Sequence, residues 1–123
     1  MARILVVDDS SFQRLTVRHM LIDRGHEPIL AENGAVGLMK LKSHRPDAIL
    51  LDLVMPVIDG FEFLEDLQSR GDPTPAIVLT ADIQDSVREI CEELGARDFL
   101  NKPIQAKCLE RVLAPFLPKE AAG

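Results

Sequence analysis

The sequence predicts an α/β fold in which one five-stranded parallel sheet is covered by helices on both faces. Short apolar runs alternate with segments of helical spacing five times along the 123 residues, at about 25 residues per unit. Alternation of this kind gives parallel strands joined by right-handed crossovers, with helices on both faces. We therefore expect one doubly wound domain over residues 1–123, with its core at about 3–117 and a short tail at 118–123.

The expected strands are apolar runs that are too short to be core helices. Their continuous apolar character is typical of parallel strands that are buried on both faces. In chain order, these runs are residues 4–7, 29–31, 48–51, 76–79 and 99–100.

The expected helices lie between these runs, where apolar residues recur at helical spacing. Gly25, Gly71 and Gly95 stand where three of the helices should end. Cys91 and Cys108 lie on helical segments and are expected to be small core side chains rather than reactive thiols. The apolar stripes are Val17, Met20 and Leu21; Phe61, Leu64 and Leu67; Ile83, Val87, Ile90 and Leu94; and Cys108, Leu109, Val112, Leu113 and Phe116.

Composition limits the kinds of partner. The chain has 14 Lys and Arg against 20 Asp and Glu, which gives a formal net charge of −6. This acidic balance counts against nucleic-acid binding, which needs clustered basic residues. No apolar stretch approaches the roughly 18 residues that a membrane-spanning helix needs. We expect a cytoplasmic protein with neither nucleic-acid binding nor membrane insertion.

Polar residues follow four of the expected strands at the point where each strand ends. Asp8 and Asp9 follow the first strand, Asp52 the third, Thr80 the fourth and Lys102 the fifth. Because the carboxyl ends of parallel strands share one edge of the sheet, we expect these side chains to meet in one cleft.

Such a cleft has the chemistry of a phosphoryl-transfer site. Three carboxylates repel one another, and an all-oxygen ligand set without His or Cys suits a hard cation such as Mg²⁺. Lys102 offers a positive charge to an anion, and Thr80 offers a hydroxyl donor. Around Asp52, this combination indicates an aspartate nucleophile that accepts a phosphoryl group.

Each of these residues also has a simpler interpretation. Asp8 or Asp9 alone fits the N-cap of a helix, and Thr80 fits the cap of a helix that starts near Gln84. Residues 52–56 fit a turn, because the proline at 56 ends regular strand pairing, and residues 102–103 fit a solvated loop. These separate interpretations leave unexplained why all the side chains fall on one edge of one sheet.

The same residues lie in motifs through which the sequence resembles the receiver domains of two-component response regulators, from Ile4 to about Phe116. The motifs are Ile-Leu-Val-Val-Asp-Asp at 4–9, Leu-Leu-Asp-Leu-Val-Met-Pro at 50–56 followed by Asp-Gly, Leu-Thr-Ala at 79–81, and Gly-Ala-Arg-Asp-Phe-Leu-Asn-Lys-Pro at 95–103. Their order and spacing together make the resemblance specific. It implies a flavodoxin-like fold with strand order 2-1-3-4-5.

The resemblance also implies the chemical roles of the site residues. Asp52 would be the phospho-acceptor, and Lys102 would pair with the phosphoryl oxygens. Asp9, Asp52 and the backbone carbonyl of Val54 would bind Mg²⁺ directly, while Asp8 would act through a bound water.

A switch beside this chemistry is implied as well. Thr80 would swing to hydrogen-bond the phosphoryl group, and Phe99 would be the aromatic rotamer switch. Many relatives carry a tyrosine there, so with Phe99 the switch would work through burial of the ring alone. Val54 and Asp82, each two residues past a site residue, would tune how fast water hydrolyses the acyl phosphate.

We therefore expect a phosphorylation-activated signalling switch that catalyses only its own phosphorylation and dephosphorylation. A histidine kinase or phosphotransfer protein would donate the phosphoryl group. A surface made by the fourth helix, the last strand and the last helix would bind a downstream protein, such as a phosphatase or a motor component. That surface includes Arg88, Glu92, Arg97, Lys107 and Arg111, whose charges fit a plain solvated face equally well.

Other classes fit part of the pattern. A receiver-like scaffold that is never phosphorylated, and a phosphorelay intermediate that passes its phosphoryl group on, are alternatives within the same fold. A haloacid-dehalogenase-like phosphohydrolase needs a second acid two residues past its nucleophile, where Val54 stands. A flavodoxin-like FMN carrier would meet repulsion between its phosphate and the acidic loop at 8–11.

Overall fold

The computed structural model describes residues 2–81 and 84–118. Within them, five parallel strands form one sheet in the order β2-β1-β3-β4-β5, which confirms the predicted fold class and strand order. The strands are β1 (Arg3–Val7), β2 (Glu27–Ala31), β3 (Ala48–Asp52), β4 (Ala76–Thr80) and β5 (Asp98–Asn101).

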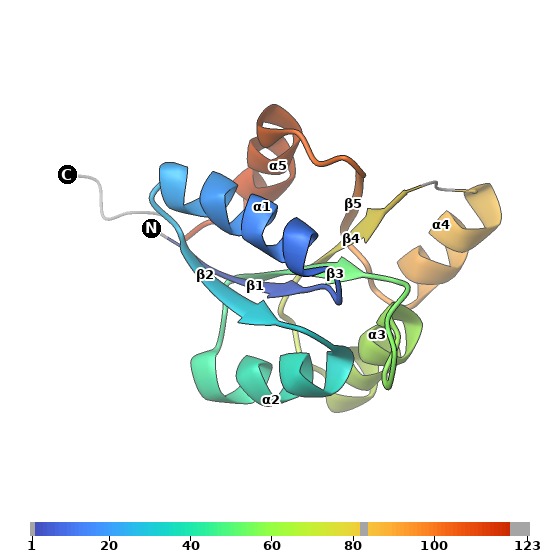
Figure 1. Ribbon diagram of the computed structural model, residues 1–123. Helices are drawn as coiled ribbons and strands as arrows, with labels where there is room; N and C mark the ends of the chain where they lie inside the picture. The colour runs from blue at the N-terminus through green and yellow to red at the C-terminus, as the bar shows by residue number, and fades with distance from the viewer. Residues whose placement is uncertain (1, 82–83, 119–123) are drawn as a thin grey trace.

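Helices cover both faces of this sheet. Figure 1 shows α1 and α5 above it, α2 and α3 below it, and α4 beside β4 and β5. The bounds are α1 (Ser11–Asp23), α2 (Gly34–His44), α3 (Gly60–Arg70), α4 (Asp85–Glu93) and α5 (Ala106–Leu113), followed by a short 3-10 helix, η1 (Ala114–Phe116). In the part of the chain that the structure describes, no helix has the length and apolar character needed to cross a membrane.

The predicted glycine stops are confirmed at three helix ends. Gly71 is the C-cap of α3, with a φ of 65°. Gly25 and Gly95 directly follow the C-caps of α1 and α4, with φ angles of 78° and 98°. Glycine adopts this left-handed conformation without the steric cost that a side chain brings. Ile83, which the sequence analysis assigned to the fourth helical stripe, lies outside the described residues.

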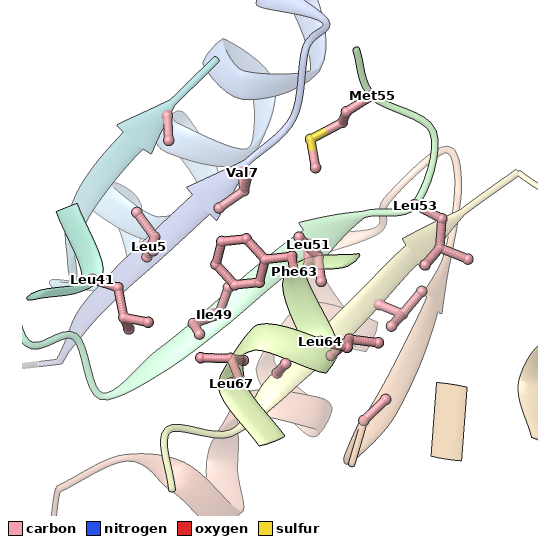
Figure 2. Close-up of a cluster of buried hydrophobic side chains, with 14 of the residues drawn as sticks. Leu5, Val7, Leu41, Ile49, Leu51, Leu53, Met55, Phe63, Leu64 and Leu67 are labelled. Carbon is pink, nitrogen blue, oxygen red and sulfur yellow. The ribbon is translucent and has the colours of Figure 1, made fainter. Parts of the chain in front are cut away.

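Two apolar clusters fill the space between sheet and helices. Alternate residues of the central strands point to opposite faces, so Leu5 and Ile49 join one cluster while Ile4 and Leu50 join the other. Figure 2 shows the first cluster, in which the fully buried Phe63 from α3 packs over the central strands. This double burial explains the continuous apolar runs in the sequence.

Both cysteines have the structural role that the sequence predicts. Cys91 is fully buried in the cluster beneath α4, and burial raises the pKa of its thiol. Cys108 is half-buried and packs against the cluster on the opposite face.

Helix α4 is held less firmly than the first helix. Its single buried residue is Cys91, whereas α1 buries both Val17 and Leu21. The α1 N-cap, Ser10, accepts a hydrogen bond through its side chain, but the side chain of Gln84, the α4 N-cap, makes no such bond. The helix that follows β4 is therefore supported by few contacts.

Candidate functional site

Three carboxylates converge at the carboxyl edge of the sheet, as predicted. Asp8 and Asp9 follow β1, and Asp52 ends β3, the strand beside it. One ligand oxygen from each of the three lies within 4.8 Å of the others. Asp8 is fully buried and Asp52 is 7% exposed, while Asp9 is open to solvent.

The loop between β1 and α1 fixes the direction of Asp8. Its Oδ1 accepts a hydrogen bond from the Ser10 N–H at 2.9 Å, and its backbone carbonyl accepts one from the Arg14 guanidinium at 2.6 Å. Ser10 is the N-cap of α1 and accepts from the Gln13 N–H, so the interpretation of Asp8 or Asp9 as the cap is wrong. The spacing of Ser10 and Gln13 is that of a capping box, a signal that could have identified the cap.

The second carboxylate oxygen of Asp8 has a nearby cation but no hydrogen-bond donor among the described residues. Its Oδ2 is buried and has no hydrogen-bond partner within residues 2–81 and 84–118. The Lys102 ammonium lies 3.4 Å away, an ion-pair distance longer than a good hydrogen bond. A buried anionic oxygen in this state has the capacity to accept a further donor or a cation.

Lys102 reaches into the cleft from the end of β5. Its Nζ lies 3.3 Å from Oδ1 of Asp52, and its side chain is only 23% exposed. The Lys102 N–H donates to the Thr80 carbonyl at 2.7 Å, and the peptide bond to Pro103 is cis. The interpretation of residues 102–103 as a solvated loop is therefore wrong for the Lys102 side chain, whereas Pro103 is exposed.

Asp52 is an unusually weak acid for an aspartate. Burial, and next the negative charge of Asp8, raise its pKa from 3.8 to about 6. The Lys102 ammonium and the Val54 N–H, which donates to Oδ1 at 3.4 Å, act in the opposite direction. The ionised form of Asp52 is therefore destabilised in the folded protein, and binding of a cation or a proton removes this destabilisation.

The loop after β3 is fixed by a close backbone approach rather than by a simple turn. The Gly60 N–H donates to the Leu53 carbonyl at 3.0 Å. A Cβ at position 60 would lie 2.6 Å from the carbonyl oxygen of Asp52 and 2.7 Å from Cα of Leu53, so no side chain fits there. Asp59 and Glu62 add a capping box at the start of α3. Val54 stays 81% exposed at the mouth of the cleft.

A cleft of about 440 Å³ runs from Asp52 to the end of β4. Thr80 and Lys102 line it together with Asp52. Phe61 on α3 and Val87 on α4 form part of its apolar wall, and neither was singled out as a site residue from the sequence. Both lie on predicted apolar helical stripes, a pattern that does not distinguish the wall of a cleft from the core.

Thr80 lines the cleft, and Phe99 lies on the neighbouring strand β5. In the register of β4 and β5, Phe99 is paired with Val78 and Thr80 with Asn101. Thr80 is buried and does not cap α4, whose N-cap is Gln84, so that alternative is wrong. Phe99 is half-buried against the apolar cluster of Figure 2. Asp82, proposed as a modulating position, lies outside the described residues.

The charged residues predicted for a partner-binding surface are all exposed. They come from α4, from α5 and from the loop before β5. The residues are Arg88, Glu92, Arg97, Lys107 and Arg111.

The strand order 2-1-3-4-5 defines the class of flavodoxin-like α/β proteins. Within this class, the chain belongs to the response regulator receiver domain family, whose model matches residues 4–114. Over 119 residues it is 35% identical to Protein PilH of Pseudomonas aeruginosa, covering 95% of this chain and 98% of that protein. Response regulator MprA of Mycobacterium sp. (strain KMS) is 44% identical over 114 residues, 91% of this chain but only 47% of MprA.

Solved structures agree with this assignment. The chemotaxis protein CheY4 of Vibrio cholerae matches with a TM-score of 0.88 and 36% identity, over 95% of this chain and 99% of that one. The receiver domain of the sensor histidine kinase PA1611 of Pseudomonas aeruginosa, with a magnesium ion in its active site cleft, matches with a TM-score of 0.84 and 31% identity, over 94% and 96%. The chain is thus a receiver domain, and receiver domains are phosphorylation-dependent signalling switches.

Proposed function

We propose that this receiver domain takes a phosphoryl group on Asp52 from a histidine kinase or a phosphotransfer protein. One observation carries the proposal: a buried Asp52 carboxylate lies 3.3 Å from the Lys102 ammonium, and two further carboxylates lie close beside it. Phosphoryl transfer needs a fixed nucleophile beside a fixed cation, because positive charge stabilises the phosphoryl oxygens in the transition state. The proposed unit spans about residues 3–117, and the proposed compartment is the cytoplasm.

Mg²⁺ fits the acidic side of the cleft. The three carboxylates offer only oxygen ligands, and the buried Oδ2 of Asp8 lacks a hydrogen-bond partner in the described part of the chain. In the proposal, Asp9, Asp52 and the Val54 carbonyl would hold the ion, and Asp8 would contribute through a bound water. When bound, the ion offsets the carboxylate repulsion and polarises the phosphoryl oxygens. The magnesium ion in the PA1611 receiver domain supports this assignment.

The reaction proceeds by nucleophilic attack of an Asp52 carboxylate oxygen on the phosphorus of the donor. The bond between phosphorus and the donor histidine nitrogen breaks, its electron pair stays on the nitrogen, and an aspartyl phosphate forms. A pKa of about 6 leaves the carboxylate mostly ionised at neutral pH, as a nucleophile must be. Lys102 pairs with one phosphoryl oxygen and the Thr80 hydroxyl donates to another. Attack of water on phosphorus later breaks the bond between phosphorus and the Asp52 oxygen, which releases inorganic phosphate and restores the free carboxylate.

The charge added at Asp52 is read out on the β4 side of the cleft. Movement of Thr80 toward the phosphoryl group, with burial of the Phe99 ring, alters the surface of α4, β5 and α5 that binds a downstream protein. The exposed charges of that surface support a role in partner binding. The modification shifts an existing equilibrium between two arrangements rather than creating a new one.

Incubation with Mg²⁺ and acetyl phosphate tests the proposal. The intact mass should rise by one phosphoryl group in the wild-type protein and should not change in Asp52→Asn. Asp59→Asn is the matched control: it removes a carboxylate from the loop that follows β3, outside the acidic cluster, and keeps a residue that caps helices well. Chelation of Mg²⁺ should prevent the modification.

Two results would count against this function. An unmodified wild-type protein under these conditions would favour the unphosphorylated scaffold. A phosphoryl group that persists in Asp52→Asn would move the acceptor to another residue.

A further inference from the structure

A cation covers the ring of Phe99. The guanidinium carbon of Arg88, on α4, lies 4.6 Å from the centroid of the ring, on β5. At this distance a cation over an aromatic face is attracted by the negative charge of the π-system. This is the one cation–π contact within residues 2–81 and 84–118.

The rest of the Phe99 environment is apolar. The ring is half-buried and packs against the cluster that contains Val78 and Cys91. Phenylalanine has no hydroxyl group, so no hydrogen bond from the ring fixes its orientation. The position of Phe99 therefore depends on packing and on the guanidinium of Arg88.

The same contact ties α4 to the sheet. Near the end of the helix, Gln68 on α3 donates a hydrogen bond to the Glu93 carbonyl at 3.0 Å. In its first half, Val87 is only partly buried and Gln84 gives no side-chain cap. Arg88 lies in that first half, so its contact with Phe99 joins the weakly supported part of α4 to β5.

We propose that Arg88 is a positioning residue that holds Phe99 in its present place and so sets how much of the unphosphorylated protein is already switched. The inference rests on the proposed function, because it concerns the switch that reports phosphorylation of Asp52. In the present arrangement the ring is partly exposed and lies under the Arg88 guanidinium. In the proposal this is the unswitched arrangement, and deeper burial of the ring would take its face away from the guanidinium, so the contact favours the unswitched protein. By linkage, a phosphoryl analogue at Asp52 and loss of the Arg88 contact favour the same state.

The test replaces Arg88 with methionine, which keeps an unbranched side chain but removes the charge. The chain has five phenylalanines, so fluorophenylalanine labelling gives few ¹⁹F signals, and Phe99→Leu identifies the one from Phe99. Beryllofluoride with Mg²⁺, which mimics the phosphoryl group, defines the switched signal. In unliganded Arg88→Met, the Phe99 signal should move toward this switched signal. The ratio of switched to unswitched protein should rise about two- to five-fold, which corresponds to the strength of an exposed cation–π pair. The apparent affinity for beryllofluoride should rise, by at most the same factor.

Lys42→Met is the matched control, because it removes one exposed cation from α2, on the same face of the sheet, without touching Phe99. It should leave the Phe99 signal and the beryllofluoride affinity unchanged. An unchanged Phe99 signal in Arg88→Met, or an equal shift in Lys42→Met, would overturn the inference. A failure of the proposed function is recognised separately, as a wild-type protein that forms no aspartyl phosphate. A change of the Phe99 signal between the unliganded wild-type protein and Arg88→Met, absent in Lys42→Met, reads out the Arg88 contact even in a protein that forms no aspartyl phosphate.

Discussion

The two sides of the site differ in how firmly the structure holds them. Asp8 directly follows β1 and Asp52 ends β3, two strands inside the sheet, and the glycine at position 60 holds the loop after β3 against its backbone. Phe99 belongs to β5, an edge strand with a single buried residue, and Thr80 leads toward the lightly packed α4. We call the part with Asp8 and Asp52 the chemical side and the part with Phe99 and α4 the readout side. The chemical side is held by more buried contacts than the readout side.

This difference fits the part that each side has in the proposed function. Groups that bind a cation and attack phosphorus gain from fixed positions, because displacement of the reacting atoms lowers the rate. A readout needs two arrangements of similar free energy, which a tightly packed element does not offer. The four predictions below test this contrast, from the largest expected effect to the smallest.

The largest effect is expected in the core beneath the chemical side. Phe63→Ala removes a fully buried ring from the cluster of Figure 2 and should lower the free energy of unfolding by about 3–5 kcal/mol. Cys91→Ala, the matched truncation under α4, removes one small group and should cost about 1 kcal/mol. Urea denaturation measures both, and equal losses would contradict the contrast.

The second prediction concerns the strain stored on the chemical side. The pKa of Asp52 is about 6 in the folded protein against an ordinary value of 3.8, so between these values the folded state binds more protons than the unfolded state. Stability therefore falls as the pH rises through this window, and above it the loss is complete. Asp52→Asn should raise the free energy of unfolding by about 1–3 kcal/mol at neutral pH without Mg²⁺.

Urea denaturation at about pH 4.5 and about pH 7.5 checks the sign, because the gain should shrink at the lower pH. Asp59→Asn serves again as the control and should show no such gain, since its carboxylate lies outside the cluster. A stability of Asp52→Asn equal to wild type at both pH values would show that the carboxylates carry no strain.

The strands and the site edge were predictable from the sequence, because both depend on local patterns. Continuous apolar runs identified the buried strands, and the rule that parallel strands share a carboxyl edge brought Asp8, Asp52 and Lys102 together. The contacts between distant side chains were not predictable. Nothing in the sequence around Arg88 indicates an aromatic partner on β5, because that contact depends on how α4 packs.

The third prediction compares α4 with α1 directly. With only Cys91 buried, α4 should open locally without unfolding of the domain, whereas α1 is held by Val17 and Leu21. Amide hydrogen exchange should therefore be at least about tenfold faster at the centre of α4 than at the centre of α1, a difference of about 1.4 kcal/mol. Equal protection of the two helices would show that α4 is as firmly held as the chemical side.

The smallest effect is expected from supplying α4 with the cap that it lacks. Gln84 occupies the N-cap with an extended backbone, the geometry in which a serine side chain accepts from the first turn, but its own side chain makes no such bond. Gln84→Ser should stabilise α4 by about 0.5–1 kcal/mol, which slows exchange of its amides about two- to five-fold. Ser10→Gln, the reverse change at the side-chain cap of α1, should instead lower global stability, since that helix belongs to the chemical side. If Gln84→Ser left α4 exchange unchanged, the missing cap would not be what loosens the helix, and its sparse burial alone would have to explain the difference from α1.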